Sequence, residues 1–138
     1  MPNAELVTHR SSRLRVLAVD DDPLALTLLA VMIRDADPDV DVETFPDADT
    51  ALAYARKHRA DLVVTDYQMP HLDGGAFITM LRNIRAYATV PVVVVTGAAD
   101  PPVVQRMQAL GALAVLEKPV SSDQLRPYLR RARARSGI

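Results

Sequence analysis

The chain has 138 residues, of which 49% are hydrophobic and 24% are charged, a balance typical of one globular domain with its own core. The formal net charge of −1 gives no overall attraction to nucleic acid, and the absence of cysteine excludes disulfides, thiol nucleophiles and thiolate metal sites. No stretch is long and apolar enough to span a membrane, and residues 1–15 lack the apolar centre of a signal peptide. We therefore expect no membrane association, no direct contact with nucleic acid and a cytoplasmic location.

Apolar runs followed by helical patterns predict alternating strands and helices in the first half of the chain. Residues 1–12 precede them without periodicity, and we expect a flexible lead-in there. The predicted strands are Leu14–Val19, a weaker Val40–Phe45 and a short buried run at 62–64. The first helix, Pro23–Arg34, is predicted to carry an apolar stripe of Leu24, Leu28 and Met32, widened by Leu29 and Ile33. Asp47 is expected to cap a second helix with an apolar face of Ala48, Ala51, Leu52 and Ala55.

The second half of the chain continues this alternation. After a loop at 67–73, a helix is predicted with its inward face made of Phe77, Met80 and Leu81. Two more strands are expected at Val90–Val95 and Leu113–Leu116, separated by a helix that Asp100 and Pro101 begin and Gly111 ends. The last helix, Ser122–Arg135, contains Pro127 beyond its first turn, which predicts a kink or a late start.

Five strands that alternate with five helices predict an α/β fold with a doubly wound, five-stranded parallel sheet. Each connection between parallel strands needs a helix that covers the sheet. We expect one folded domain over residues 13–135 and a short C-terminal tail at 136–138.

Polar residues follow four of the predicted strands. They are Asp20 and Asp21, Asp66, Thr96 and Lys118, in chain order. Because the carboxyl ends of parallel strands meet at one edge of a sheet, we expect these side chains to lie close together. Two carboxylates a few ångströms apart repel by about 4 kcal/mol at an effective dielectric of about 20, so the cluster needs cations. Its oxygen ligands suit Mg²⁺, and Lys118, one of two lysines beside fourteen arginines, adds a fixed positive charge.

This combination of groups predicts phosphoryl transfer to a carboxylate. A carboxylate beside Mg²⁺ and an ammonium can attack a phosphoryl donor in line and form an aspartyl phosphate. The hydroxyl of Thr96 can donate a hydrogen bond to a phosphoryl oxygen. Asp66, at the tip of a buried strand, is the carboxylate around which this hypothesis is built.

Five short segments, in this order and at this spacing, resemble the receiver domain of two-component response regulators. They are Val-Asp-Asp-Asp-Pro at 19–23, Val-Val-Thr-Asp-Tyr-Gln-Met-Pro at 63–70, Asp-Gly at 73–74, Val-Val-Thr-Gly-Ala at 94–98 and Glu-Lys-Pro at 117–119. The resemblance extends over residues 14–133, and the chain is similar to the chemotaxis-type single-domain regulators of this family. It implies a flavodoxin-like fold with strand order 2-1-3-4-5, and a signalling module that catalyses only its own phosphorylation and dephosphorylation.

The resemblance also implies roles for individual residues. Asp66 would be the phosphoacceptor, and Thr96 and Lys118 would contact the phosphoryl group. The Mg²⁺ ligands would be Asp66, Asp21, the backbone carbonyl of Gln68 and, largely through water, Asp20. The phosphoryl donor would be a histidine kinase, a phosphotransfer protein or a small acyl phosphate.

One position departs from the family pattern. The switch residue three positions before the lysine is commonly Tyr or Phe, and here it is Val115. We therefore expect Thr96 and Val115 to switch without an aromatic ring, with the helix face near 100–110 repacking in its place. The output surface would be residues 100–135, which would contact a downstream protein, a tethered effector domain or a second copy of the chain.

Two other functions stay open at this point. A phosphatase of the haloacid dehalogenase type would use Asp20 as nucleophile and Asp22 as acid and base, although Leu24 stands where that family has Thr or Val. A phosphorylation-independent interaction module would use only the surface of the last two strand and helix units. Val115 favours that module, and the complete set of site residues opposes it. Modification of Asp66 or of Asp20 would distinguish the receiver from the phosphatase.

Overall fold

The computed structural model describes residues 13–138, so the lead-in predicted at 1–12 lies outside the described residues. The bounds of the elements are β1 Leu14–Val19, α2 Pro23–Ala36, β2 Val40–Phe45, α3 Ala48–Ala55, β3 Leu62–Asp66, α4 Gly74–Arg82, the 3-10 turn η1 Arg85–Tyr87, β4 Val92–Thr96, α5 Pro101–Ala109, β5 Ala114–Glu117 and α6 Ser122–Ser136. The five strands are parallel and lie in the order β2-β1-β3-β4-β5. The predicted doubly wound sheet and its strand order are confirmed.

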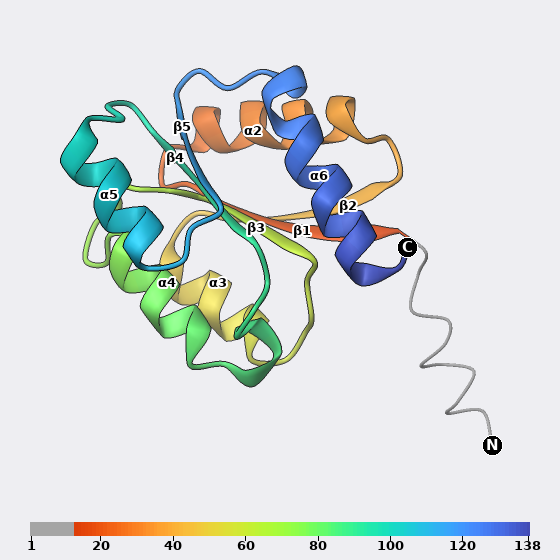
Figure 1. Ribbon diagram of the computed structural model, residues 1–138, viewed down its shortest axis with the longest axis horizontal. Helices are drawn as coiled ribbons and strands as arrows, with labels where there is room; N and C mark the ends of the chain where they lie inside the picture. Colours follow the sequence, from red (N-terminus) through yellow and green to blue (C-terminus); the bar gives the residue numbers. More distant parts are fainter. Residues whose placement is uncertain (1–12) are drawn as a thin grey trace.

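Helices cover both faces of the sheet (Figure 1). The pair α2 and α6 lies on one face, and α3, α4 and α5 lie on the other. Side chains alternate along β1, so Leu14 and Val16 pack beneath α2 and α6, whereas Leu17 and Val19 pack beneath the other three helices. Burial of each such side chain stabilises the fold by about 1.5–3 kcal/mol. Strands covered on both faces are mainly apolar, and the central strands β3 and β4 show this pattern, whereas the edge strand β2 alternates apolar with polar residues.

The predicted apolar stripe of α2 is wrong in part. Leu24 and Leu28 are 67% and 52% exposed. The buried residues of this helix are Leu29, Ala30 and Ile33. The sheet and α6 contact α2 on the flank that carries these residues. The periodicity located a wide apolar stripe correctly, but it does not say which edge of that stripe faces the sheet.

The inward face predicted for α4 also needs one correction. Met80 is 39% exposed, whereas Ile78 is buried together with Phe77 and Leu81. Residues 77, 78 and 81 are spaced as one helical face, and residue 80 lies at its margin. Met80 therefore contributes less to the core than the sequence suggested.

Helix α6 begins at Ser122 and continues through Pro127 to Ser136, so the predicted late start is wrong. Ser121 caps it in both directions: its hydroxyl accepts from the backbone N–H of Gln124, and the Gln124 side chain accepts from the backbone N–H of Ser121. This double cap supports the first turn that precedes Pro127. With 15 residues α6 is the longest described helix, and neither it nor any other described helix has the length and apolar character needed to cross a bilayer.

Candidate functional site

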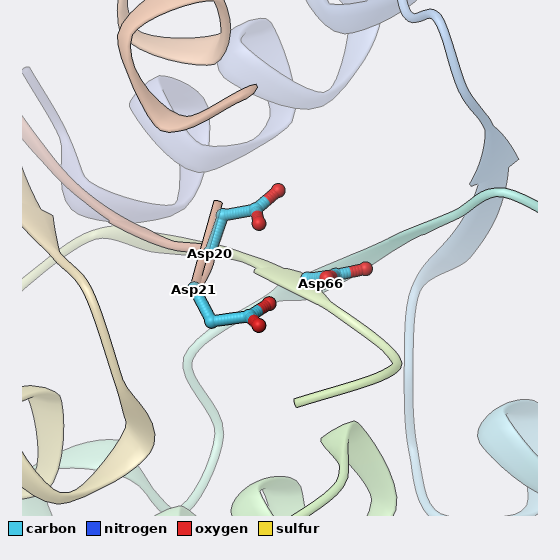
Figure 2. Close-up of side chains that lie close together, drawn as sticks. All are labelled: Asp20, Asp21 and Asp66. Atoms are coloured by element: carbon cyan, nitrogen blue, oxygen red, sulfur yellow. The ribbon is translucent and has the colours of Figure 1, made fainter. Parts of the chain in front are cut away.

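Three carboxylates meet at the carboxyl edge of the sheet. Asp20 and Asp21 follow β1 and Asp66 ends β3, and Figure 2 shows the three side chains close together. One carboxylate oxygen of each residue lies within 4.8 Å of those of the other two. Strand register causes this, because Val19 is paired with Thr65, so Asp20, the residue after β1, and Asp66, the last residue of β3, lie at the same level of the sheet. Asp20 and Asp66 are buried, whereas Asp21 is exposed to solvent.

A lysine that follows the edge strand β5 reaches this cluster. The Nζ atom of Lys118 is 2.9 Å from Oδ2 of Asp20 and 3.3 Å from Oδ1 of Asp66. The backbone N–H of Lys118 donates to the carbonyl of Thr96 at 2.8 Å, which fixes where the side chain starts. Three carboxylates still outnumber the one ammonium, and each carboxylate pair repels by about 3–4 kcal/mol at an effective dielectric of about 20. A divalent cation among these oxygens would remove that excess of negative charge.

The site shifts the pKa values of two of its members. Burial, and then the charge of Asp20, raise the pKa of the Asp66 carboxyl against the opposing effect of Lys118. Burial alone would lower the pKa of Lys118, but its hydrogen bond to Asp20 and the charges of Asp66 and Asp20 outweigh that effect and raise it overall. Lys118 therefore stays charged at neutral pH, and Asp66 carries an electrostatic cost that a bound cation would relieve.

This cost predicts that, without metal, the stability of the unmodified chain and that of Asp66→Asn differ by an amount that changes with pH. Because folding raises the pKa of Asp66, the unfolded chain ionises this group at a lower pH than the folded protein does, and the contribution of Asp66 to stability falls as the pH rises from about 4. Asp66→Asn removes the cost, so its advantage over the unmodified chain should grow toward neutral pH by on the order of 1 kcal/mol. Urea unfolding of both proteins in EDTA at several pH values measures this difference. A difference that does not change with pH would contradict it.

Thr96 borders the cluster from the end of β4. Its side chain is buried, and its hydroxyl accepts from the backbone N–H of Ala98 at 3.3 Å and donates to the Ala98 carbonyl at 3.4 Å. Both contacts are long for hydrogen bonds that involve a hydroxyl, so they hold it weakly. The hydroxyl can exchange them for a ligand oxygen at small cost.

The carboxylate of Asp22 is not part of the cluster. The Asp22 carboxylate caps α2 by accepting from the backbone N–H of Leu24 at 3.0 Å, and the Asp22 N–H donates to Oδ1 of Asp20 at 2.9 Å. Gln68 lies in the loop after β3 with an exposed side chain. The structure therefore brings together Asp20, Asp21, Asp66 and Lys118, and it gives Asp22 a structural role.

Position 74, next to the site, has no room for a side chain, and the sequence analysis missed this constraint. The backbone N–H of Gly74 donates to the Tyr67 carbonyl at 2.6 Å. A Cβ at position 74 would lie 3.0 Å from the carbonyl oxygen of Asp66 and from Cα of Tyr67, both of which are backbone atoms. Glycine thus lets α4 start close against the loop that follows Asp66. The Asp73-Gly74 pair was the available signal, and the sequence analysis used it as one of the five segments of the resemblance without a reason for the glycine.

A second contact that the sequence analysis missed joins α5 to the same loop. The Nη1 atom of Arg106 donates to the Tyr67 hydroxyl at 3.2 Å and to Oδ2 of Asp73 at 3.3 Å. Gly75 leaves room for this guanidinium, since a Cβ there would lie 2.8 Å from Nη2 of Arg106. No local pattern in the sequence connects Arg106 with Tyr67, which are 39 positions apart.

Val115 is a half-buried strand residue packed against the core on this face of the sheet.

Comparisons with known proteins agree with this geometry. Residues 16–130 match the family model of the response regulator receiver domain. The chain is 34% identical over 113 residues to the cyclic di-GMP phosphodiesterase response regulator RpfG of Xanthomonas campestris, covering 82% of this chain and 30% of that protein. It is also 34% identical over 121 residues to the transcriptional regulatory protein PdtaR of Mycobacterium tuberculosis, covering 88% of this chain and 57% of that protein.

A solved structure of a chemotaxis protein also matches the chain. The chemotaxis protein CheY4 of Vibrio cholerae superposes with a TM-score of 0.79 at 32% identity, covering 87% of this chain and 98% of that one. The chain thus matches nearly all of that protein. It spans only 30% and 57% of the two curated relatives, so parts of those proteins have no counterpart in the similarity.

Proposed function

Because the chain belongs to the family of response regulator receiver domains, we propose that it accepts a phosphoryl group on Asp66 and signals through the change of state that follows. The observation that carries this proposal is the cluster of Asp20, Asp21 and Asp66, with Lys118 in contact with two of its members. The family is one of phosphorylation-dependent signalling modules, and the acidic site matches that role.

In the proposed reaction, the Asp66 carboxylate is the nucleophile. One of its oxygens forms a bond to phosphorus while the bond between phosphorus and the donor's leaving atom breaks, and the electron pair stays with the donor. Lys118 is within 3.3 Å of Asp66 and would bind a phosphoryl oxygen as a fixed positive charge. The Thr96 hydroxyl would donate to another phosphoryl oxygen after giving up its weak contacts with Ala98.

The proposed metal ligands are the carboxylates of Asp20, Asp21 and Asp66 and the backbone carbonyl of Gln68. These oxygens are the hard donors that Mg²⁺ prefers, and the carboxylate oxygens within 4.8 Å of one another support a shared cation. When bound, Mg²⁺ would neutralise charge on the transferring phosphoryl group. The hydrogen bond of Asp20 to Lys118 favours an outer position for Asp20, through water, and leaves Asp21 and Asp66 for direct contact.

The proposed phosphoryl donors are a histidine kinase, a phosphotransfer protein or a small acyl phosphate. The exposed apolar side chains of α2 support a protein donor: Leu24, Leu28 and Val31. A cavity of about 270 Å³ next to them is lined by Leu28 and Met32 and also by Asp20 and Lys118. A docked protein would thus cover apolar surface directly beside the site. A cytoplasmic location stays an expectation from the sequence.

Intact mass after incubation with acetyl phosphate tests the proposed function. With Mg²⁺ we expect a gain of one phosphoryl group, and with EDTA we expect no gain, because the excess negative charge at the site would repel the donor. If no gain appears, beryllofluoride binding distinguishes a short-lived acylphosphate from a site that does not accept phosphate. Absence of both the mass gain and beryllofluoride binding would overturn the proposal in favour of a phosphorylation-independent module.

The phosphatase hypothesis receives no support from the site. Asp22, which would have to act as its acid and base, caps α2 instead. Asp20, its nucleophile, is hydrogen bonded to Lys118 and to the backbone N–H of Asp22. Peptide mapping of the modified residue would show Asp66 under our proposal and Asp20 under the phosphatase hypothesis.

The proposed output surface is formed by residues 100–135, which would contact a downstream protein, a tethered effector domain or a second copy of the chain. Because Val115 supplies no aromatic ring, we propose that the contact of Arg106 with Tyr67 and Asp73 couples the phosphorylation site to α5. Tyr67 directly follows Asp66, so a movement of this loop on phosphorylation would change the hydrogen bond that Arg106 of α5 donates to the Tyr67 hydroxyl.

This coupling predicts that Arg106→Gln uncouples α5 from the site. On addition of beryllofluoride and Mg²⁺, we expect amide chemical shift changes in α5 to fall by about half or more, because the loop and α5 lose their direct bond. Changes at the amides of Gly97 and Ala98 should persist. The matched control is Gln108→Ala, an exposed change on the same helix. Unchanged α5 responses in Arg106→Gln would reject this route.

A further inference from the structure

A second cavity lies at the amino edge of the sheet, opposite the edge that carries Asp66. It measures about 410 Å³ and forms where the segments before β4 and β5 meet the ends of α4 and α6. Three arginines line it together with Thr89 and Gly111: Arg82, Arg131 and Arg135. None of its described lining residues is acidic.

Arg82 is held in this cavity by neutral partners. Its Nη1 donates to the carbonyls of Tyr87 and Val90 at 2.9 Å and 2.6 Å, and its Nη2 approaches the carbonyl of Gly111 at 3.3 Å. Carbonyl oxygens orient a guanidinium without neutralising its charge. Burial, and then the charge of Arg135, lower the pKa of Arg82. The positive charge of Arg82 is therefore fixed at the cavity wall beside that of Arg135.

The other two arginines come from α6, four residues apart and hence on one face of the helix. Arg135 donates from Nη2 to the Thr89 hydroxyl at 2.6 Å, a neutral contact. Two other arginines of α6 are paired: Arg126 with Asp123, and Arg133 with Asp37 at 2.7 Å. Within residues 13–138, no carboxylate forms an ion pair with the three arginines of the cavity. The cavity thus gathers positive charge that this part of the chain does not neutralise.

We propose that this cavity binds a small phosphorylated molecule, whose phosphate group is held by Arg82, Arg131 and Arg135. Guanidinium groups bind phosphate oxygens with pairs of parallel hydrogen bonds, and several of their N–H groups are not used by the contacts above. The volume is within the range of small-ligand sites, and Val90 and Leu113 offer apolar contact to the rest of the ligand. A concave site in a chain of net charge −1 favours a small molecule over a nucleic-acid backbone.

The test is a titration of ¹⁵N-labelled protein with pyrophosphate, at constant ionic strength and in EDTA so that Asp66 and its metal play no part. We expect saturable shifts at the amides of Thr89 and Gly111 and at Nε of Arg82. The double variant Arg131→Gln with Arg135→Gln should raise the dissociation constant at least about tenfold, because two charged donors are lost. Both side chains are exposed, so the spectrum of the variant should otherwise stay that of the folded protein.

A matched double variant, Arg126→Gln with Arg130→Gln, removes the same charge from the same helix outside the cavity. It should keep the dissociation constant within about twofold. Titration of Asp66→Asn should give the unchanged constant, which separates this site from the proposed phosphorylation. Failure to saturate, or equal weakening in the matched variant, would overturn the proposal. Stronger perturbation of the same residues by a short DNA duplex would also overturn it, in favour of a nucleic-acid contact.

Discussion

Asp66→Asn is expected to abolish acylphosphate formation and leave the fold intact. Asparagine has nearly the same shape as aspartate, but its amide is not a nucleophile for phosphorus. Asp66 is buried at the end of β3, and its replacement removes repulsion with Asp20 at the cost of its contact with Lys118. After acetyl phosphate and Mg²⁺, the variant should show a mass gain less than about one hundredth of that of the unmodified chain.

The matched control for this result is Asp22→Asn. It makes the same chemical change at the same edge of the sheet, at a residue that caps α2. Asparagine caps helices about as well as aspartate, so this variant should fold and still gain one phosphoryl group. Persistent labelling of Asp66→Asn would reject Asp66 as the acceptor. Labelling that maps to Asp20 would revive the phosphatase hypothesis.

Lys118→Met is expected to slow phosphorylation by roughly 100-fold or more, while it tightens the binding of Mg²⁺. The ammonium lies 2.9 Å from Asp20 and 3.3 Å from Asp66, where it would stabilise charge that develops on the phosphoryl group. The same ammonium opposes a cation at the carboxylates, so its removal leaves a more negative site for Mg²⁺. Methionine retains much of the apolar stem, so little packing is lost.

Two measurements separate these opposite effects. The mass gain with time gives the phosphorylation rate, and calorimetric titration gives the affinity for Mg²⁺. The matched control is Lys57→Met, a change at the only other lysine of the chain, which is exposed and follows α3. It should change neither quantity. Weaker Mg²⁺ binding in Lys118→Met would mean that Lys118 organises the carboxylates rather than competing with the metal.

Much of the fold follows from patterns within short segments. Strands buried on both faces must be apolar along their length, and this is why the runs at 14–19, 62–64 and 90–95 marked the central strands. The predicted starts of two strands differ from the structure by one or two residues: β4 begins at Val92 and β5 at Ala114. The reason is that backbone pairing, rather than hydrophobicity, sets where a strand begins and ends.

The composition of the acidic site was also predictable, because a parallel sheet brings the carboxyl ends of its strands to one edge. Asp20, Asp21 and Lys118 come directly after their strands and Asp66 ends its strand, so local pattern and topology together bring them into contact. Their roles in phosphoryl transfer stay predictions that the variants above address. The resemblance at five short segments agreed with this arrangement and with the family that the comparisons identified.

What only the tertiary structure decided is how the helices meet the sheet and one another. The buried flank of α2, the bond between Arg106 and Tyr67, and the cavity that gathers Arg82 and Arg135 all join elements far apart in the chain. Such contacts depend on the angle and offset at which helices pack, and the period of a single helix does not encode these quantities. The sequence by itself therefore determined the order of the elements and the residues at the strand ends, because both depend on short-range pattern. The packed structure decided which side chains those elements present to each other and to solvent.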